Sequence, residues 1–236
     1  MPELAVNVDH IATLRQARGV SYPEPAAAAA LAELAGANGV VVHLRGDRRH
    51  IQDRDVRILR QTVQTRLTLE MAATPEMLEI AVDIQPDAVT LVPEKDEEIT
   101  TEGGLDVIAH NVSDELAALK KAGIKTCVFI DPDVSRIKAA GEAGAEMVEI
   151  HTGAFCDAQT RESADRELEK IARAAEFAVG MGLVANAGHG IGYETVMAFR
   201  GMGIHEFSIG HSIVSRASLV GMDRAVRDML ALIDRL

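Results

Sequence analysis

Residues 118–153 read ALKKAGIKTCVFIDPDVSRIKAAGEAGAEMVEIHTG, and this stretch decides the fold. Within it, a helix end, a glycine and a polar residue lead into the apolar run TCVFI. The helical segment RIKAAGEAG follows, and the same kind of corner then leads into a second run, MVEI. Because nearly continuous apolar runs are typical of strands buried on both faces, the stretch predicts βα repeats in a parallel sheet.

The same corner recurs in the segments ELAGANGV and VGMGLVA, before and after this stretch. Eight strand-length runs in 236 residues leave about 30 residues for each βα unit. This favours an α/β fold of the (β/α)8 TIM-barrel type, a closed parallel sheet, over a doubly wound open sheet. Since no linker divides the chain, residues 1–236 are expected to form a single domain. The predicted strands span residues 4–9, 39–44, 66–72, 88–93, 125–130, 147–153, 183–190 and 206–213.

Capping signals predict several helix ends. Pro25 opens the segment AAAAALAELAG and Gly36 ends it, while Thr74 is an N-cap directly before Pro75. Residues 13–23, TLRQARGVSYP, are expected to form a long loop after the first strand. Further helices are expected over residues 136–144, 163–181 and 219–236.

Composition limits the functional class. The net charge is −12, which argues against a nucleic-acid or anionic-membrane partner, and the absence of Trp argues against stacking of bases. No apolar run approaches the roughly 18 residues of a membrane span, and the start MPELAVNVDH is unlike a signal peptide. Cys127 and Cys156 cannot form a disulfide framework and are expected to stay reduced. A cytoplasmic protein is predicted.

Histidines gather where the strands are predicted to end, which is where barrels of this kind place their chemistry. Each one alone has a structural explanation, as a capping or hydrogen-bonded group. A cluster at one rim suits repeated proton transfer, because histidine titrates near pH 6.5. The histidines at predicted strand ends are His10, His43, His151, His189 and His211, and His50 lies in a rim loop.

Glu70 is a carboxylate within the apolar run LTLEMA, which is costly unless the group is paired or functional. Either catalysis or a salt bridge to an arginine lining the barrel explains it. Gly190 and Gly210 stand beside histidines, where backbone N–H groups can approach a ligand. Loops after the last two strands are a common phosphate cradle, although tight turns are an alternative.

Arginines supply candidate anion ligands. Arg45, two residues after His43, is placed to reach a phosphate or another polar substrate group. Arg48 and Arg49 are explained as well by a solvated helix face. Arg18, in the expected loop, is a further candidate anion clamp, either on a lid or at a subunit contact.

Several segments together resemble the pyridoxine 5′-phosphate synthase family of the deoxyxylulose-dependent vitamin B6 route. The resemblance implies a (β/α)8 barrel with extra helices and a homo-octamer that needs no metal and no organic cofactor. It implies a transferase that condenses 3-amino-2-oxopropyl phosphate with 1-deoxy-D-xylulose 5-phosphate. The products are pyridoxine 5′-phosphate, inorganic phosphate and water, formed by acid/base catalysis without a protein Schiff base. The segments are VNVDHIATLRQARG, VHLRGDRRHIQDRDVRILRQT, LEMA, LVPEK, TTEGGLD, EIHTG, NAGHG and IGHSI.

The resemblance also assigns roles. It implies that His43 and Glu70 accept protons and that His189 donates one. Two departures from the family pattern stand out: Gly46 replaces a usual Glu, and Thr68 replaces a common Asn. The implied ligands of the aminooxopropyl phosphate are Asn7, Arg18, Gly190, Gly210 and His211, and those of the sugar phosphate are Asp9, His10, Arg45, His50 and Thr100.

Three rival functions remain open. A metal-dependent hydrolase or epimerase would use histidines and carboxylates as ligands, but the His-x-His expected after the first strand is replaced by Asp9-His10. A lysine-dependent aldolase would use Lys95, the lysine near a predicted strand end. A non-catalytic protein that binds phosphate ligands agrees poorly with the presence of Glu70 and His189.

Overall fold

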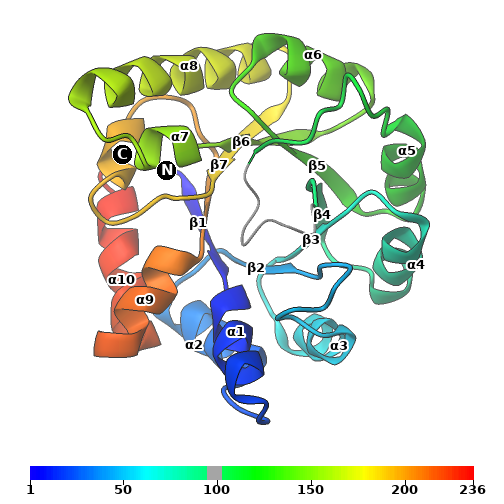
Figure 1. Cartoon of the computed structure of the whole chain (residues 1–236), viewed down its shortest axis with the longest axis vertical. Coiled ribbons are helices and arrows are strands. Elements are labelled where there is room, and N and C mark those ends of the chain that lie inside the picture. Colours follow the sequence, from blue (N-terminus) through cyan, green and yellow to red (C-terminus); the bar gives the residue numbers. More distant parts are fainter. Residues whose placement is uncertain (95–102) are drawn as a thin grey trace.

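The computed structural model describes residues 1–94 and 103–236. All eight predicted strands are present, and they pair in sequence order as a closed parallel barrel (Figure 1). The predicted TIM barrel is therefore confirmed. Several strands are shorter than predicted, because the last residues of each run already turn into the following loop or helix. The strands are β1 Glu3–Asn7, β2 Gly39–His43, β3 Leu67–Met71, β4 Ala88–Leu91, β5 Lys125–Ile130, β6 Met147–His151, β7 Val184–Gly188 and β8 Glu206–Ile209.

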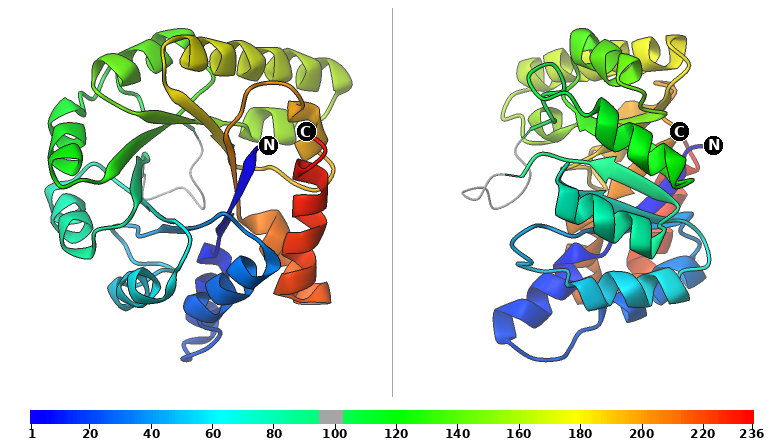
Figure 2. Two further views of the ribbon diagram at one scale, coloured as in Figure 1. Left: turned by 180° about the vertical axis from the view of Figure 1, so that it is seen from behind. Right: turned by 90° about the vertical axis from the view of Figure 1, so that its right-hand side faces the viewer.

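Helices form an outer layer around this barrel, as the two further views show (Figure 2). Across the described residues, none is long and apolar enough to cross a bilayer. The helices are α1 Asp9–Arg18, α2 Pro25–Ala35, α3 Asp53–Thr62, α4 Pro75–Ile84, α5 Ser113–Lys121, α6 Val134–Glu142, α7 Gly153–Cys156, α8 Arg161–Gly180, η1 Val196–Phe199, α9 His211–Val220 and α10 Met222–Ile233.

The predicted capping signals are confirmed. Pro25 is the first residue of α2, and Gly36 ends that helix with φ of 112°, a left-handed conformation that glycine tolerates. Thr74 caps α4, since its side chain accepts a hydrogen bond from the Met77 N–H at 3.3 Å. These capping residues stand at the helix ends where the chain turns back toward the barrel.

The expected loop over residues 13–23 is wrong for its first half, because α1 covers Asp9–Arg18. The buried residues of α1 are Asp9, Ala12 and Arg15, so the helix turns a largely polar face inward. An apolar periodicity could not reveal a helix of this kind. Gly19, with φ of 63°, then ends it.

The C-terminal elements also differ from prediction. β8 stops at Ile209, and residues 211–236 form two helices, α9 and α10, where one long strand and one helix were expected. Ile213 and Val214 are buried within α9, which extended the apolar run past the end of the strand. A short apolar run cannot by itself distinguish a strand from a buried helical turn. His211 is therefore the first residue of a helix.

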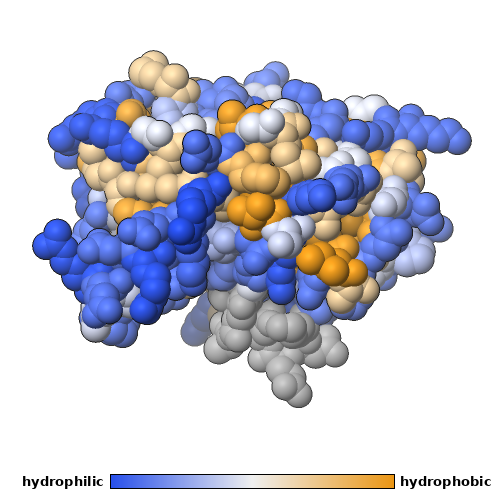
Figure 3. Space-filling model, turned by 90° about the horizontal axis from the view of Figure 1, so that it is seen from above, coloured by the Kyte–Doolittle hydropathy of each residue, from blue (hydrophilic) through white to orange (hydrophobic). Residues whose placement is uncertain are grey.

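The hydrophobic core lies between the barrel and the helices. Leu4, Val42, Leu69 and Phe207 point outward from the strands and are fully buried there, each contributing roughly 1.5–3 kcal/mol. The molecular surface over α6 and α8 mixes hydrophobic and hydrophilic residues (Figure 3). This core holds the strands in place, so the side chains that face into the barrel are not needed for hydrophobic packing and can be polar.

The inside of the barrel is unusually polar. Many TIM barrels fill this space with bulky branched side chains, whereas here it holds carboxylates, amides and hydroxyls. The interior leaves two cavities, one of about 880 Å³ and one of about 200 Å³, and Glu149 borders both. The smaller cavity is lined by Thr68 and by Arg66, which pairs with Glu3 at 3.0 Å. The larger cavity contains the candidate site.

Candidate active site

The larger cavity lies at the carboxyl ends of the strands, where the fold predicts chemistry. It brings together residues from both ends of the chain, so the closed barrel assembles them. Of the predicted site residues that the structure describes, all but Arg18 line it. These residues are Asn7, Asp9, His10, His43, Arg45, His50, Glu70, His189, Gly190, Gly210 and His211.

Two of the predicted site residues remain, and the structure places one of them. Arg18 is the exposed last residue of α1, which extends away from the barrel (Figure 1), and it does not line the cavity of its own chain. Its role in anion binding stays a prediction, and its position agrees better with the subunit-contact alternative. Thr100 and the rival Lys95 lie outside the described residues.

Asp9 joins the ends of β1 and β2. Its Oδ1 accepts the N–H of His43 at 2.9 Å, and its Oδ2 accepts a hydrogen bond from Asn7 Nδ2 at 2.9 Å. Asn7 in turn accepts the Asp9 N–H at 2.9 Å. Asp9 and His10 belong to the first turn of α1, which corrects their placement at a strand end. The bonds hold a carboxylate at the floor of the cavity beside the base candidate His43.

His43, the last residue of β2, contacts two carboxylates. Its Nε2 lies 2.9 Å from Glu94 Oε1, and its Nδ1 lies 3.9 Å from Glu70 Oε2. Burial raises the pKa of Glu94, but hydrogen bonds from His43 and from the Gly46 N–H outweigh burial and lower it overall. An ionised Glu94 can only accept a hydrogen bond, so the neutral form of His43 carries its proton on Nε2. Its Nδ1 lone pair is then available as a base on the Glu70 side.

Glu94 was missed by the sequence analysis as a functional residue. Its position directly after the fourth predicted strand was the available signal, because carboxyl ends of neighbouring strands meet at one rim. The Gly46 N–H donates to Glu94 at 3.0 Å, and a Cβ at this glycine would meet Glu94 at an ordinary 3.4 Å. The departure at Gly46 therefore leaves the His43–Glu94 pair intact. Thr68 lies on the inner face of β3, below Glu70, and lines the smaller cavity.

Glu70 and Glu149 form a pair of carboxyls inside the barrel. Burial, with the charges of Glu149 and Asp9, raises the pKa of Glu70 well above its usual range. Burial raises the pKa of Glu149 to about 7. Because two like charges are costly in a poorly solvated site, the pair retains a proton near neutral pH. Within the described residues, Glu70 contacts the His43 ring and no arginine pairs with it, so the alternative of an arginine partner is wrong.

Glu149 was not among the predicted site residues, although it stands in an apolar strand as Glu70 does. The argument applied to Glu70 would have found it. Gly188 on the neighbouring β7 makes room for it, since a Cβ there would lie 1.9 Å from Glu149 Oε1. A glycine is therefore required at this position if the carboxyl group is to keep its place.

His189 occupies a strained turn after β7, with φ of 71°, between Gly188 and Gly190. Thr152 holds this turn by donating through Oγ1 to the Gly188 carbonyl at 3.0 Å and the His189 carbonyl at 2.6 Å. Non-glycine residues with positive φ are uncommon and often functional. The turn directs the imidazole into the cavity.

A second histidine supports the His189 ring. The His151 and His189 rings are 5.0 Å apart in an edge-to-face arrangement, and Asp131 contacts His151 Nδ1 at 3.3 Å. A Cβ at Gly153 would lie 2.6 Å from His151 Nε2, so glycine is needed beside these rings. Burial, and then the nearby His151, lowers the pKa of His189. Unliganded His189 is therefore neutral at pH 7.

The opposite side of the rim combines β1 and the start of α9. The His10 and His211 rings are 5.0 Å apart, and His10 Nδ1 is buried with no hydrogen-bond partner among the described residues. A Cβ at Gly210 would lie 3.0 Å from Asn7 Cβ, so the glycine allows this close approach. The N-terminus of α9 lies at this side of the cavity, and the free N–H groups of a helix N-terminus favour binding of an anion.

His50 and Arg45 complete the rim after β2. His50 Nδ1 accepts the Ile51 N–H at 2.8 Å, which leaves Nε2 to carry the proton of the neutral ring. Arg45 is 3% exposed, and its Nε lies 3.5 Å from Asp47 Oδ1. The two side chains offer the cavity a neutral donor and a cation. Arg48 and Arg49 lie in the loop before α3, so the explanation by a solvated helix face is wrong. Arg48 pairs with Asp53, whereas Arg49 pairs with Asp47 and lines the cavity.

Comparison with known proteins identifies the family of the chain. The family model described as pyridoxal phosphate biosynthesis protein PdxJ matches residues 4–235. A protein of Desulforapulum autotrophicum named pyridoxine 5′-phosphate synthase is 62% identical over 99% of both chains. One of the same name from Desulfatibacillum aliphaticivorans is 59% identical over 98% of both. A solved structure titled KGPDC from Streptococcus mutans, 17% identical, covers 100% of this chain and 98% of its own, with a TM-score of 0.65, and shares the fold. The chain therefore belongs to the family of pyridoxal phosphate biosynthesis proteins, whose relatives named here are pyridoxine 5′-phosphate synthases.

Proposed function

We propose that this enzyme condenses 3-amino-2-oxopropyl phosphate with 1-deoxy-D-xylulose 5-phosphate and forms pyridoxine 5′-phosphate, inorganic phosphate and water. The observation that carries the proposal is the contact of His43 with Glu70 and Glu94 in one cavity that also holds His189. The cavity volume of about 880 Å³ is sufficient for two small phosphorylated substrates. Family membership supports the identity of the product.

The first step joins the substrates. The amine of the aminooxopropyl phosphate attacks the ketone of the sugar phosphate and forms a carbinolamine, which loses water to give an imine. Since the substrate brings its own amine, no lysine of the protein is needed. His43 Nδ1 takes the proton released from nitrogen, and the Glu70–Glu149 pair can return a proton to the leaving hydroxyl because it is partly protonated near neutral pH.

The later steps remove a carbon-bound proton, expel one phosphate and close the ring with loss of a second water. Each step moves a proton between groups held in fixed positions, which is what this cavity provides. His189 is proposed as the donor to a departing oxygen. Its turn, fixed by Thr152, keeps the ring at the cavity wall opposite His43.

Two regions are proposed to hold the two phosphates. The first contains Gly190, Gly210 and His211, at the loops after β7 and β8, where the N-terminus of α9 adds N–H donors. The second contains Arg45 and His50 after β2. Local donors of this kind are needed because the net charge of −12 repels anions at long range.

The deciding experiment is formation of pyridoxine 5′-phosphate from the two substrates by purified protein, followed by mass spectrometry. Product without added metal and with a chelator present is expected. Loss of activity in the chelator would favour the metal-dependent alternative. Inactivation by borohydride in the presence of substrate would favour a lysine Schiff base at Lys95. Failure to convert the two substrates would end the proposal.

We also propose a homo-octamer in the cytoplasm. Both cysteines are free thiols, in keeping with a reducing compartment. Large apolar side chains are exposed near α1, α2 and α9, which supports burial against other subunits. Light scattering coupled to size exclusion measures the number of subunits. The exposed side chains are Leu14, Tyr22, Leu34 and Leu219.

A further inference from the structure

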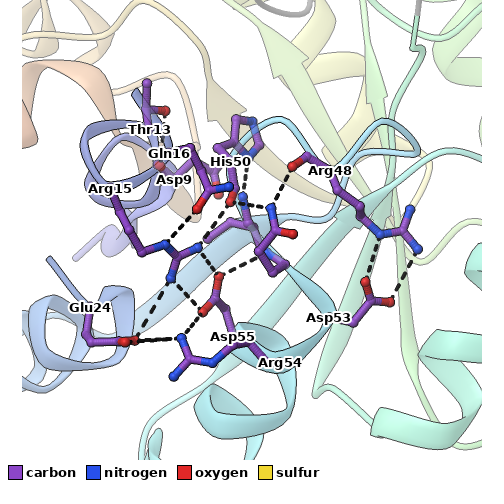
Figure 4. A network of polar contacts seen from close by, with 12 residues as sticks. Asp9, Thr13, Arg15, Gln16, Glu24, Arg48, His50, Asp53, Arg54 and Asp55 are labelled. Carbon is purple, nitrogen blue, oxygen red and sulfur yellow. Dashed lines mark hydrogen bonds and ion pairs between the residues drawn. The ribbon is translucent and has the colours of Figure 1, made fainter. Parts of the chain in front are cut away.

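A buried ion pair lies just outside the cavity. Arg15 on α1 and Asp55 on α3 have side chains 4% and 1% exposed, and neither lines the cavity. Their two hydrogen bonds are parallel, from Nη1 to Oδ1 at 2.8 Å and from Nη2 to Oδ2 at 2.6 Å (Figure 4). Burying two charges is costly unless their remaining hydrogen-bonding capacity is also satisfied. The partners of the remaining hydrogen bonds of Arg15 and Asp55 therefore indicate the role of the pair.

Arg15 Nε also donates to Gln16 Oε1 at 2.9 Å, and Asp55 Oδ1 accepts from Arg54 Nη1 at 3.0 Å. Two further hydrogen bonds of the pair reach the backbone of the segment that follows β2 (Figure 4). Arg15 Nη2 also donates to the His50 carbonyl at 3.2 Å, and Asp55 Oδ2 accepts the Gln52 N–H at 2.9 Å. The Gln52 side chain donates to the same His50 carbonyl at 3.0 Å. The backbone is thus held on the C-terminal side of His50, at its own carbonyl and at the N–H two residues later.

The His50 ring depends on this backbone. Its Nδ1 accepts the N–H of Ile51, a residue that is fully buried, at 2.8 Å. The peptide that joins His50 to Ile51 carries both the carbonyl bonded by Arg15 and the N–H bonded by the ring. If that peptide rotates, the acceptor at Nδ1 loses its donor, and the ring can adopt either neutral tautomer.

The charge state of the ring agrees with this picture. Burial lowers the pKa of His50, while Asp9 opposes the shift and His43, Arg45 and His10 add to it. The ring is neutral near pH 7 and its proton is on Nε2, on the cavity side. A neutral N–H donor in that position recognises an acceptor oxygen of a hydroxyl, carbonyl or phosphate group.

We propose that Arg15 and Asp55 are positioning residues, which hold His50 as an uncharged Nε2–H donor to the sugar phosphate substrate. The inference rests on the proposed function for the identity of that substrate. It adds two residues of α1 and α3 that act on the reaction through His50, without touching a ligand. The alternative is that the pair serves only to fasten α1 to α3.

The test compares Asp55→Asn, which keeps the shape and removes the charge, with a matched control that breaks an exposed ion pair of the same helix α3. Asp83→Asn breaks the exposed pair between Arg57 of α3 and Asp83 of α4, whose atoms are 2.7 Å apart. Asp55→Asn should raise the KM for the sugar phosphate roughly 10- to 100-fold and leave the KM for the aminooxopropyl phosphate within about twofold. Asp83→Asn should change neither constant. Equal changes in both constants for Asp55→Asn would show a structural role only.

A double-mutant cycle asks whether the effect passes through His50. In a His50→Ala background, Asp55→Asn should cause little further loss, because the group that it positions is already absent. A full additional loss would overturn the proposal. If Asp55→Asn does not fold, as judged by circular dichroism, Arg15→Lys replaces it, because this variant keeps the charge and loses the parallel pair of bonds.

A readout without substrates separates this proposal from the proposed function. Nitrogen-15 chemical shifts of the histidine rings report the tautomer of His50 in the free protein. The wild type should show a single Nε2–H tautomer, and Asp55→Asn a mixture of both. An unchanged tautomer in Asp55→Asn would overturn the positioning role whatever the enzyme converts, whereas failure of wild-type turnover alone would overturn only the proposed function.

Discussion

At the scale of single residues, Glu70 carries the sharpest prediction. Glu70→Gln keeps the shape of the side chain and removes its ability to exchange a proton with the cavity. Turnover should fall about 10²- to 10⁴-fold, with the circular dichroism spectrum unchanged. The matched control is Glu146→Gln at the other end of the barrel, where this carboxylate accepts the Thr126 N–H at 3.1 Å. Near wild-type turnover in Glu70→Gln would remove its catalytic role.

Glu149 predicts an effect of pH on stability. Its pKa of about 7 lies above the ordinary value of 4.5, so the folded state retains a proton that the unfolded state has released. Stability from this group is complete below about pH 4.5 and is lost as the pH rises through 7. Glu149→Gln should therefore stabilise the protein at pH 8, by about 3–4 kcal/mol at 1.4 kcal/mol per pKa unit, and much less at pH 4.5.

Thermal denaturation at both pH values measures this difference. Glu142→Gln is the control, because this exposed carboxylate on α6 pairs only loosely with Lys138, at 3.7 Å. It should show no change between the two pH values. An equal gain for Glu149→Gln at pH 4.5 and pH 8 would mean that the carboxyl group is ionised throughout, in conflict with its buried position beside Glu70.

The same residues show how much of the site a sequence can reveal. Glu70 could be predicted because a carboxylate in an apolar strand is unusual in any fold, and Glu149 meets the same criterion. Glu94 gave only a weak signal, its place directly after a predicted strand, since its importance comes from the contact that the barrel creates with His43. Arg15 also escaped, because the sequence does not tell a buried arginine from a solvated one.

At the scale of elements, the strands were predictable and the two helices at the active-site rim were not. The strands were predictable because their outward faces must be apolar to pack against the outer helices. The resulting apolar runs located all eight strands. α1 buries a polar face, with Asp9 and Arg15 inward, so hydrophobic periodicity gives no signal for it. α9 is separated from β8 by a single residue, and its buried Ile213 and Val214 resemble a continuation of the apolar positions of the strand. In both helices, residues that the active site needs replace some of the residues that would give a clear helical pattern of hydrophobicity.

The start of α9 provides a prediction at this scale. Gly210→Val places a side chain where even a Cβ would lie 3.0 Å from Asn7 Cβ, over the first N–H groups of the helix. The KM for the aminooxopropyl phosphate should rise more than that for the sugar phosphate, because this end of the cavity is proposed to hold the first. Gly180→Ala in α8, where nothing lies within 4 Å of the new Cβ, should change neither. Equal increases in both constants would mean that the loop is a general structural element.

At the scale of the whole molecule, closure of the barrel brings together groups that are far apart in the sequence. His43 at the end of β2 and His189 after β7 line the same cavity from separate parts of the rim. One lies beside carboxylates that hold its proton on Nε2, and the other lies beside a second imidazole and is neutral when no ligand is bound. Two histidines in such different surroundings are suited to opposite roles in one reaction.

This division of labour predicts a bell-shaped dependence of kcat on pH in single-turnover measurements, where proton transfer limits the rate. His189 must be protonated to donate, so its loss in His189→Asn should flatten the alkaline limb. The acceptor must be deprotonated, so His43→Asn should flatten the acidic limb, which Glu70 can share.

The position of the alkaline limb gives a second and stricter test. Burial and His151 lower the pKa of His189 in the free enzyme, so the alkaline limb of kcat/KM, which reports the free enzyme, should lie below pH 6.5. A bound phosphate dianion favours the imidazolium form, so the same limb of kcat, which reports the complex, should lie at higher pH. Both limbs should be absent in His189→Asn. If the two profiles coincide, or if they persist in that variant, His189 positions the substrate and another group delivers the proton.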